Sequence, residues 1–174
     1  VICTSRVEET LFTGFPEFKF VLESTKFYDP SKDTTVGGDG AQRWNNPATW
    51  GGDGDDLPAV QLYNLVRGIS FGGSWFYGLQ GVAAAQLPTA EWIAAIEKCR
   101  LEVAGPDGNE PQYRCGGEVL VSARISDTVE ALLTSCNGRL AEIGGFYKPK
   151  VGAPDEVSGS FTDRDIITTS KQSF

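Results

Sequence analysis

Residues 111–151 constrain the fold most, because several local signals follow one another within this stretch. The valine-rich run Glu118–Ser122 predicts a short strand. Asp127 and Glu130 form a capping-box pattern ahead of a helix expected over residues 127–137. The apolar residues of that helix have helical spacing and should turn into the core: Val129, Leu132, Leu133 and Cys136.

A hairpin is expected directly after this helix. Gly138 stands where a helix commonly ends, and the apolar segments LAEI and FYKPKV then flank Gly144 and Gly145. Two consecutive glycines tolerate the positive φ angles that a tight hairpin turn requires. Residues 111–151 therefore predict a strand-helix-hairpin unit, in which one amphipathic helix lies on a few antiparallel strands. The fold class expected is α+β.

Several phrases of the sequence resemble, in the same order, the tail-tip host-specificity proteins of long-tailed phages and the related hub proteins of gene transfer agents. The phrases that carry this resemblance are FPEFKFVLESTKFYDP, NNPA, PAVQLYNLVRG, LPTAEWIAAIEKCR, YRCGGEVLV, LLTSCNGRL, GGFYKPKVG and FTDRDIITTS. They cover residues 14–169. The chain departs from the family pattern at Cys115–Gly117, where the family has "CNG", and at an apparent insertion, TWGGDGDDL, after NNPA.

The resemblance implies a structural role, and no enzymatic activity is expected because no complete nucleophile, metal site or acid pair emerges from the residues. It implies an antiparallel sheet or small β-barrel-like layer with about three packed helices, as in phage baseplate hub domains. The intact protein would form a ring, expected to be a trimer, that closes the distal tail tube, contacts other tail proteins and links the tube to host-recognition parts. Assembly in the bacterial host cytoplasm and residence at the virion tail tip would follow, for an infectious phage, a prophage or a gene transfer agent.

Composition excludes several classes of function. A net charge of −8 opposes binding to nucleic acid, which requires a basic surface. The sequence has no apolar run of the roughly 20 residues that a membrane-spanning helix needs. Histidine is absent, which removes Ser-His-Asp and Cys-His catalytic systems. The chain begins at Val1 and lacks methionine, so we expect residues 1–174 to be a single excised module of a longer tail protein.

The rest of the chain is expected to alternate loops with two further helices. Phe18, Phe20 and Leu22 alternate with charged residues and predict a strand within residues 15–29. Residues 30–56, rich in glycine and aspartate, predict a long and partly mobile surface loop or insertion. A helix is expected to begin near Asp56 and Pro58 and to end at Gly68, with Val60, Tyr63 and Val66 on its apolar face. A loop is expected over residues 70–86, and Thr89 should then cap a second helix. One face of this helix should be formed by Trp92, Ile96, Cys99 and Val103. A turn-rich linker is expected over residues 104–112.

No catalytic residue, cofactor or metal site emerges from the sequence. The cysteines lack C-x-x-C spacing, and Cys99 and Cys136 are expected as buried apolar side chains rather than as a disulfide. Four aspartates stand in GGDG-type loops: Asp39, Asp53, Asp55 and Asp56. The sequence around them does not continue a calcium-binding pattern, so we expect solvated carboxylates. A calcium-stabilised adhesion module is the weaker alternative. Two acidic residues could also form a catalytic pair for sugar hydrolysis, but we favour the interpretation that the carboxylates are solvated on the surface.

Aromatic residues in the loops are the candidates for binding. Trp75, Phe76 and Tyr77 stand in a row between glycines and are the candidate partner contact, while Trp44 and Trp50 lie in the glycine-rich loop. Such side chains can anchor a protein interface, stack on sugars or fold back onto the core. The alternative to a tail-hub module is therefore a carbohydrate-binding or cell-wall-degrading tail module.

Overall fold

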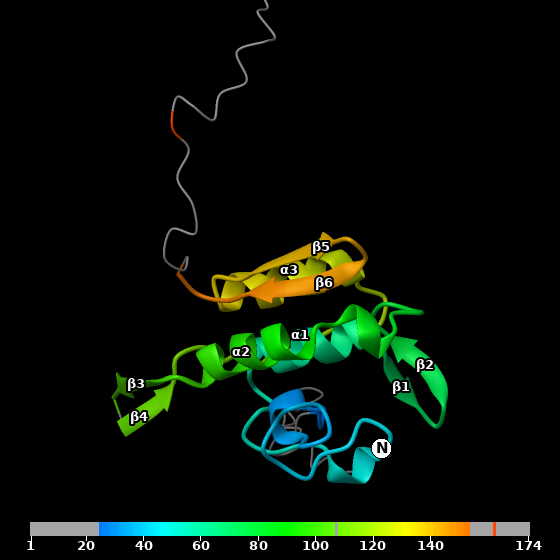
Figure 1. Ribbon diagram of the computed structural model, residues 1–174, viewed down its shortest axis with the longest axis horizontal. Coiled ribbons are helices and arrows are strands. Elements are labelled where there is room, and N and C mark those ends of the chain that lie inside the picture. The colour runs from blue at the N-terminus through cyan, green and yellow to red at the C-terminus, as the bar shows by residue number, and fades with distance from the viewer. Residues whose placement is uncertain (1–24, 107, 154–161, 163–174) are drawn as a thin grey trace, which may run out of the picture.

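Two helices form the middle of the molecule and carry a layer on each side (Figure 1). The computed structural model describes residues 25–106, 108–153 and 162. Helices α1 (Pro58–Arg67) and α2 (Thr89–Arg100) pack against each other. The coiled segment 25–56 lies on one side of them, and α3 (Ile125–Ser135) with the hairpin of β5 and β6 lies on the other.

Helix α1 has the buried face that its sequence predicts. Pro58 opens the helix after Leu57, which is the N-cap in place of the expected Asp56, and Gly68 ends it at φ +85°. The predicted apolar stripe is confirmed as buried: Val60, Tyr63 and Val66. No residue of α1 is exposed, because the helix is enclosed by both neighbouring layers.

Helix α2 is buried along one face but is shorter than its apolar pattern suggests. Trp92, Ile96 and Cys99 have no exposed surface, as expected. Thr89 is the first residue of the helix rather than its cap, which is Pro88. Val103 was expected on the same face, and this is wrong, because the helix ends at Arg100 and Val103 is exposed on a following strand.

The described strands form three antiparallel hairpins. They are β1 (Ile69–Phe71) with β2 (Ser74–Tyr77), β3 (Glu102–Gly105) with β4 (Gly108–Pro111), and β5 (Arg139–Ile143) with β6 (Phe146–Lys150). With the three α-helices they make the predicted α+β mixture, without a closed barrel in the described part of the chain. The first two hairpins correct the sequence reading, which placed only loops at residues 70–86 and 104–112.

The third hairpin confirms its prediction, whereas the predicted strand before α3 is absent. Gly144 and Gly145 have φ angles of +60° and +82°, the conformation of a tight primed turn. Residues 118–122 form no strand, because no neighbouring strand in the described residues pairs with them. Tyr113, near the start of this unit, also lies in irregular chain.

Helix α3 covers the core only partly. It begins at Ile125, ahead of the expected start, and no side chain caps it, so the capping box of Asp127 and Glu130 does not form. None of its residues is fully buried, and Leu132 is half-buried at the edge of the core rather than inside it. Gly138 follows the helix closely, and its N–H donates to the carbonyl of Leu133 at 2.6 Å.

Segment 25–56 is a folded layer, which corrects the expectation of a surface loop. It contains the short 3-10 helices Pro30–Lys32 and Pro47–Thr49, and Tyr28, Asp29 and Asp33 are almost completely buried. The carboxylates of Asp29 and Asp33 accept hydrogen bonds from the turn N–H groups of Ser31 and Thr35. Most of the strand predicted over residues 15–29 lies outside the described residues, and residues 25–29 contain no strand.

One side chain of α1 anchors this layer. Asn64 is 2% exposed, and its amide group donates to the carbonyl of Tyr28 at 2.7 Å and accepts from the N–H of Tyr28 at 3.1 Å. Trp44 and Trp50 stack at a centroid distance of 5.2 Å and both contact the ring of Tyr28. These tryptophans therefore belong to the core edge, which leaves the aromatics of β2 as the candidates for binding.

Candidate binding groove

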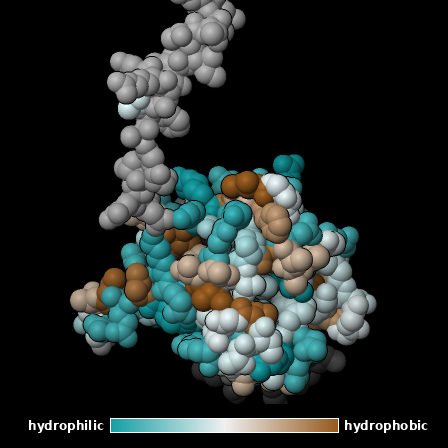
Figure 2. Space-filling model, in the orientation of Figure 1, coloured by the Kyte–Doolittle hydropathy of each residue, from teal (hydrophilic) through white to brown (hydrophobic). Residues whose placement is uncertain are grey.

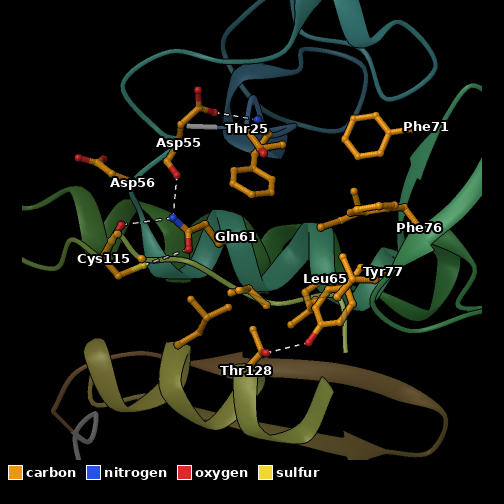
Figure 3. Close-up of a pocket in the computed structure, with 17 residues that line it drawn as sticks. Thr25, Asp55, Asp56, Gln61, Leu65, Phe71, Phe76, Tyr77, Cys115 and Thr128 are labelled. Carbon is orange, nitrogen blue, oxygen red and sulfur yellow. Dashed lines mark hydrogen bonds between the residues drawn. The ribbon is translucent and has the colours of Figure 1, made fainter. Parts of the chain in front are cut away.

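An open groove of about 310 Å³ runs between the three layers (Figure 3). Segment 25–27 and Asp55 form one wall, α1 contributes Gln61 and Leu65 to the middle, and α3 contributes Thr128 and Leu132 to the other wall. Phe71, Phe76 and Tyr77 of the β1–β2 hairpin close one end. The irregular segment after Cys115 adds Val119 and Val121.

The hairpin places its aromatic side chains by means of a β-bulge. Ile69 pairs with Tyr77 and Ser70 pairs with Trp75, so Phe76 is an extra residue on β2. A bulge breaks the strict alternation of side chains along a strand. Consequently the consecutive residues Phe76 and Tyr77 both line the groove, and Phe76 packs edge-on against Phe71 at a centroid distance of 5.1 Å.

The three predicted contact residues have three different environments. Tyr77 is 6% exposed, and its hydroxyl lies 2.8 Å from the hydroxyl of Thr128 and donates to the carbonyl of Ala123 at 3.2 Å. Its ring is therefore part of the interior and not a contact surface. Phe76 is 44% exposed in the groove wall, and Trp75 is 47% exposed outside the groove.

The opposite end of the groove is polar, but its polar groups already bind one another. Gln61 donates through Nε2 to the carbonyls of Asp55 and Cys115 at 2.8 and 3.3 Å, and the Cys115 thiol donates to Gln61 Oε1 at 3.2 Å. The Asp55 carboxylate accepts from the N–H groups of Phe27 and Gly52. Asp56 forms an ion pair with Arg114. These bonds tie segment 25–56 to the chain that follows α2.

The cysteine thiol at the polar end of the groove favours a structural role over a catalytic one. Burial raises the pKa of the Cys115 thiol to about 11, so the nucleophilic thiolate is scarce at neutral pH. Cys99 and Cys136 are free and buried, as the sequence predicted, and hydrogen bonding with Cys136 together with burial raises the pKa of Cys99 far above its ordinary range. Cys3 lies outside the described residues.

The two buried carboxylates of segment 25–56 are engaged in fixed pairs. Asp29 accepts from Arg100 Nη2 at 2.6 Å, and Asp33 accepts from Arg43 Nη1 at 2.9 Å. Burial acts to raise the pKa of Asp33, but hydrogen bonds from Thr35 and Tyr28 and the charge of Arg43 outweigh it and hold the pKa below its usual value. These ion pairs fasten the layer to α2 and to itself.

The acidic loop residues considered as calcium ligands are dispersed. The side chains of Asp39 and Asp53 are 76% and 75% exposed, whereas Asp55 and Asp56 hold the partners described above. Within residues 25–106 and 108–153, no group of three or more His, Cys, Asp or Glu side chains is arranged to hold a metal ion. The chain also has no described helix with the length and apolar character to cross a membrane.

Sequence reasoning missed the residues that complete the groove. Phe71 was assigned to a loop, although Gly72 and Gly73 between two short apolar runs are a hairpin signal. Val119 was expected in a short strand, and no expectation followed from the sequence for Gln61. Nothing local distinguishes Gln61 from a surface glutamine, because its partner Cys115 is 54 residues away.

The chain matches no family model, and a comparison with curated proteins also gave no match.

Proposed function

We propose that this chain is a structural module of the tail-tip hub of a phage, prophage or gene transfer agent, and that it acts by contacting other proteins. The observation that carries the contact role is the β1–β2 hairpin, which presents Phe71, Trp75 and Phe76 at 44 to 57% exposure. The phage assignment rests on the ordered phrases of the sequence.

Large aromatic side chains are effective anchors of protein interfaces. They bury a large area with few rotatable bonds, and they often dominate the energy of binding. The hairpin stands at one end of the α1–α2 layer, and the β3–β4 hairpin stands at the other (Figure 1). The second hairpin also exposes an apolar residue, Val103, and Figure 2 shows hydrophobic side chains reaching the surface there.

This arrangement suits a subunit with neighbours on more than one side. Two-stranded hairpins have unpaired edges, which natural monomers usually shield. In the proposed ring each protomer would cover such edges of the next one, and other tail proteins would cover the remaining surface. The net charge of −8 supports protein partners over nucleic acid.

A carbohydrate-binding role has less support from the same groove. Sugar sites combine an aromatic platform with free polar groups that bind hydroxyls. The groove provides Phe71 and Phe76, but Gln61 and Asp55 at its other end are hydrogen-bonded within the protein. A ligand would have to break these bonds, so the contact role is the better account.

Electron microscopy of particles from the source culture tests the proposal. Gold-labelled antibodies against this chain should bind the distal end of the tail, while antibodies against the major capsid protein serve as the control and bind the head. Label on the head, or particles that never contain the chain by mass spectrometry, would contradict the tail-tip assignment.

A further inference from the structure

The groove exposes apolar side chains that a folded chain usually covers. Val119 and Val121 are 49% and 55% exposed, and they line the groove together with Phe71 and Phe76. Phe71 and Phe76 stand at one end, and the carboxylates stand at the other (Figure 3). A concave apolar surface of this kind usually marks a place where another molecule binds.

One wall of the groove also has a backbone without partners. In the described ranges, the N–H and C=O groups of residues 116–119 form no hydrogen bond, although Cys115 before them donates to the carbonyl of Asp56. Gly116 and Gly117 line the groove, and a Cβ on either would meet nothing within 4 Å. Another backbone can therefore approach closely here. Four free residues in a row can pair with one added strand, as an exposed sheet edge does.

The charge of the groove indicates the chemistry of its occupant. Among the described residues that line it, Asp55 and Asp56 alone carry a charge. Arg114 pairs with Asp56, whereas the Asp55 carboxylate accepts only the N–H groups of Phe27 and Gly52, so one negative charge has no cationic partner in the described residues. A lysine or arginine side chain would be attracted to this charge through space, and the hydrogen bonds within the protein would stay formed.

We propose that the groove binds an extended segment of another protein, which adds as a strand beside residues 116–119. Apolar side chains of this segment would lie against Phe76 and Val119, and a lysine or arginine farther along would reach the end with Asp55 and Asp56. Four residues of a strand extend over about 13 Å, which sets the length of the paired part. The inference rests on the proposed contact role, and in a tail tip the segment would belong to another tail protein.

Peptide binding to the full chain tests this proposal. The probes are acetylated and amidated heptapeptides T-x-T-x-T-z-T, in which x is Val or Phe and z is Lys, Ser or Glu. At micromolar chain concentration, the Lys peptides should bind at least about tenfold more tightly than the Glu peptides, and added salt should reduce the difference. In hydrogen–deuterium exchange, a bound Lys peptide should slow the amides of residues 116–119 by at least about tenfold.

Two pairs of variants assign the binding to the groove. Phe76→Ala should weaken binding of the Lys peptides by at least about tenfold. Trp75→Ala should leave it unchanged, because Trp75 has similar exposure but lies outside the groove. Asp56→Asn should reduce the preference for Lys over Glu, whereas Asp39→Asn, which removes an exposed carboxylate far from the lining, should keep it. Native circular dichroism spectra show that the variants are folded.

Three outcomes would overturn the proposal: no peptide of the set binds, Lys and Glu peptides bind equally, or residues 116–119 are protected without peptide. Protection that is independent of chain concentration would mean that another part of this chain covers the groove, and protection that rises with concentration would identify a second copy. None of these outcomes bears on the tail-tip location, which the labelled antibodies test separately.

Discussion

The side chain of Asn64 forms hydrogen bonds with the backbone of Tyr28, as a neighbouring strand would. It pairs with both backbone groups of Tyr28, and it also donates to the Val60 carbonyl one helical turn earlier, at 2.8 Å. A buried polar side chain with complete hydrogen bonding stabilises a single arrangement, while an incomplete set is costly. Asn64 therefore fixes where segment 25–56 lies on α1.

Replacing this residue should destabilise the fold. Asn64→Ala leaves the buried N–H and C=O of Tyr28 unpaired, and we expect a loss of about 1–3 kcal/mol in the free energy of unfolding. Urea denaturation measures the change. Asn109→Ala removes an exposed amide on β4 and should stay within about 0.5 kcal/mol. Equal effects of the two substitutions would show that Asn64 does not anchor the segment.

Asp33 gives the stability a defined pH dependence. Because the pKa of Asp33 in the folded chain is below the usual 3.8, the unfolded chain binds this proton more tightly. The contribution of the carboxylate is therefore complete above about pH 3.8 and is lost as the pH falls through the folded pKa. Asp33→Asn should be less stable than the unsubstituted chain at pH 7, by about 1–3 kcal/mol.

The difference between Asp33→Asn and the unsubstituted chain should narrow when unfolding is measured at successively lower pH below that value. Asp39→Asn is the control, because its carboxylate is mostly exposed and its pair with Lys32 contributes little. A difference that is constant with pH would mean that the charge of Asp33 is not what stabilises the segment.

At the scale of elements, the β1–β2 hairpin is held against the end of α1 by close backbone contact. Leu79 donates its N–H to the carbonyl of Leu65 at 2.9 Å, and a Cβ on Gly78 would lie 2.4 Å from that same oxygen. Only glycine fits there without movement of the hairpin. This contact keeps Phe76 and Tyr77 in line with the groove.

Two glycine substitutions distinguish the stability cost of a clash with α1 from the cost of backbone strain at positive φ. Gly78 and Gly81 both have positive φ, +98° and +77°, but a Cβ on Gly81 meets nothing within 4 Å. Gly81→Ala should therefore cost only the strain of the left-handed region, about 1–2 kcal/mol. Gly78→Ala should cost more, because it also displaces the hairpin. Thermal unfolding compares the two, and equal losses would show that the hairpin is not seated on α1.

Elements with local signals could be predicted from the sequence, and elements that depend on distant partners could not. The apolar faces of α1 and α2 and the turn at Gly144 and Gly145 follow from spacing and glycine placement within a few residues. The folding of segment 25–56 depends on Asn64, 36 residues from Tyr28, so its composition alone suggested a loop. Residues 118–122 have the composition of a strand, but a strand also needs a partner.

The candidate site was predicted in part for the same reason. Aromatic residues between glycines predict a contact at the β2 segment, but burial decides which of them can reach a partner. The sequence alone could not show that Tyr77 is buried whereas Trp75 is exposed. The bulge at Phe76 reorients Tyr77, and this bulge arises only from the pairing of two strands. The polar end of the groove joins residues from three separate parts of the chain and had no local signal.

At the scale of the whole molecule, the proposed function depends on the exposed surface. The polar groups of the groove are used for internal bonding, and exposed apolar residues lie at the hairpins on both ends of the α1–α2 layer. Contacts between subunits in a tail tip would add together in a ring. One such contact alone, in the isolated chain, should be weak.

Sedimentation across a concentration series tests the central claim most directly. The chain should be monomeric at micromolar concentration and should self-associate when concentrated, and Trp75→Ala should reduce that association while the circular dichroism spectrum stays native. Phe146→Ala is the matched control, because this aromatic on β6 is 45% exposed, close to the 47% of Trp75, and lies on a different hairpin. Association that is absent at every concentration, or unchanged in Trp75→Ala, would contradict a contact through the β1–β2 hairpin.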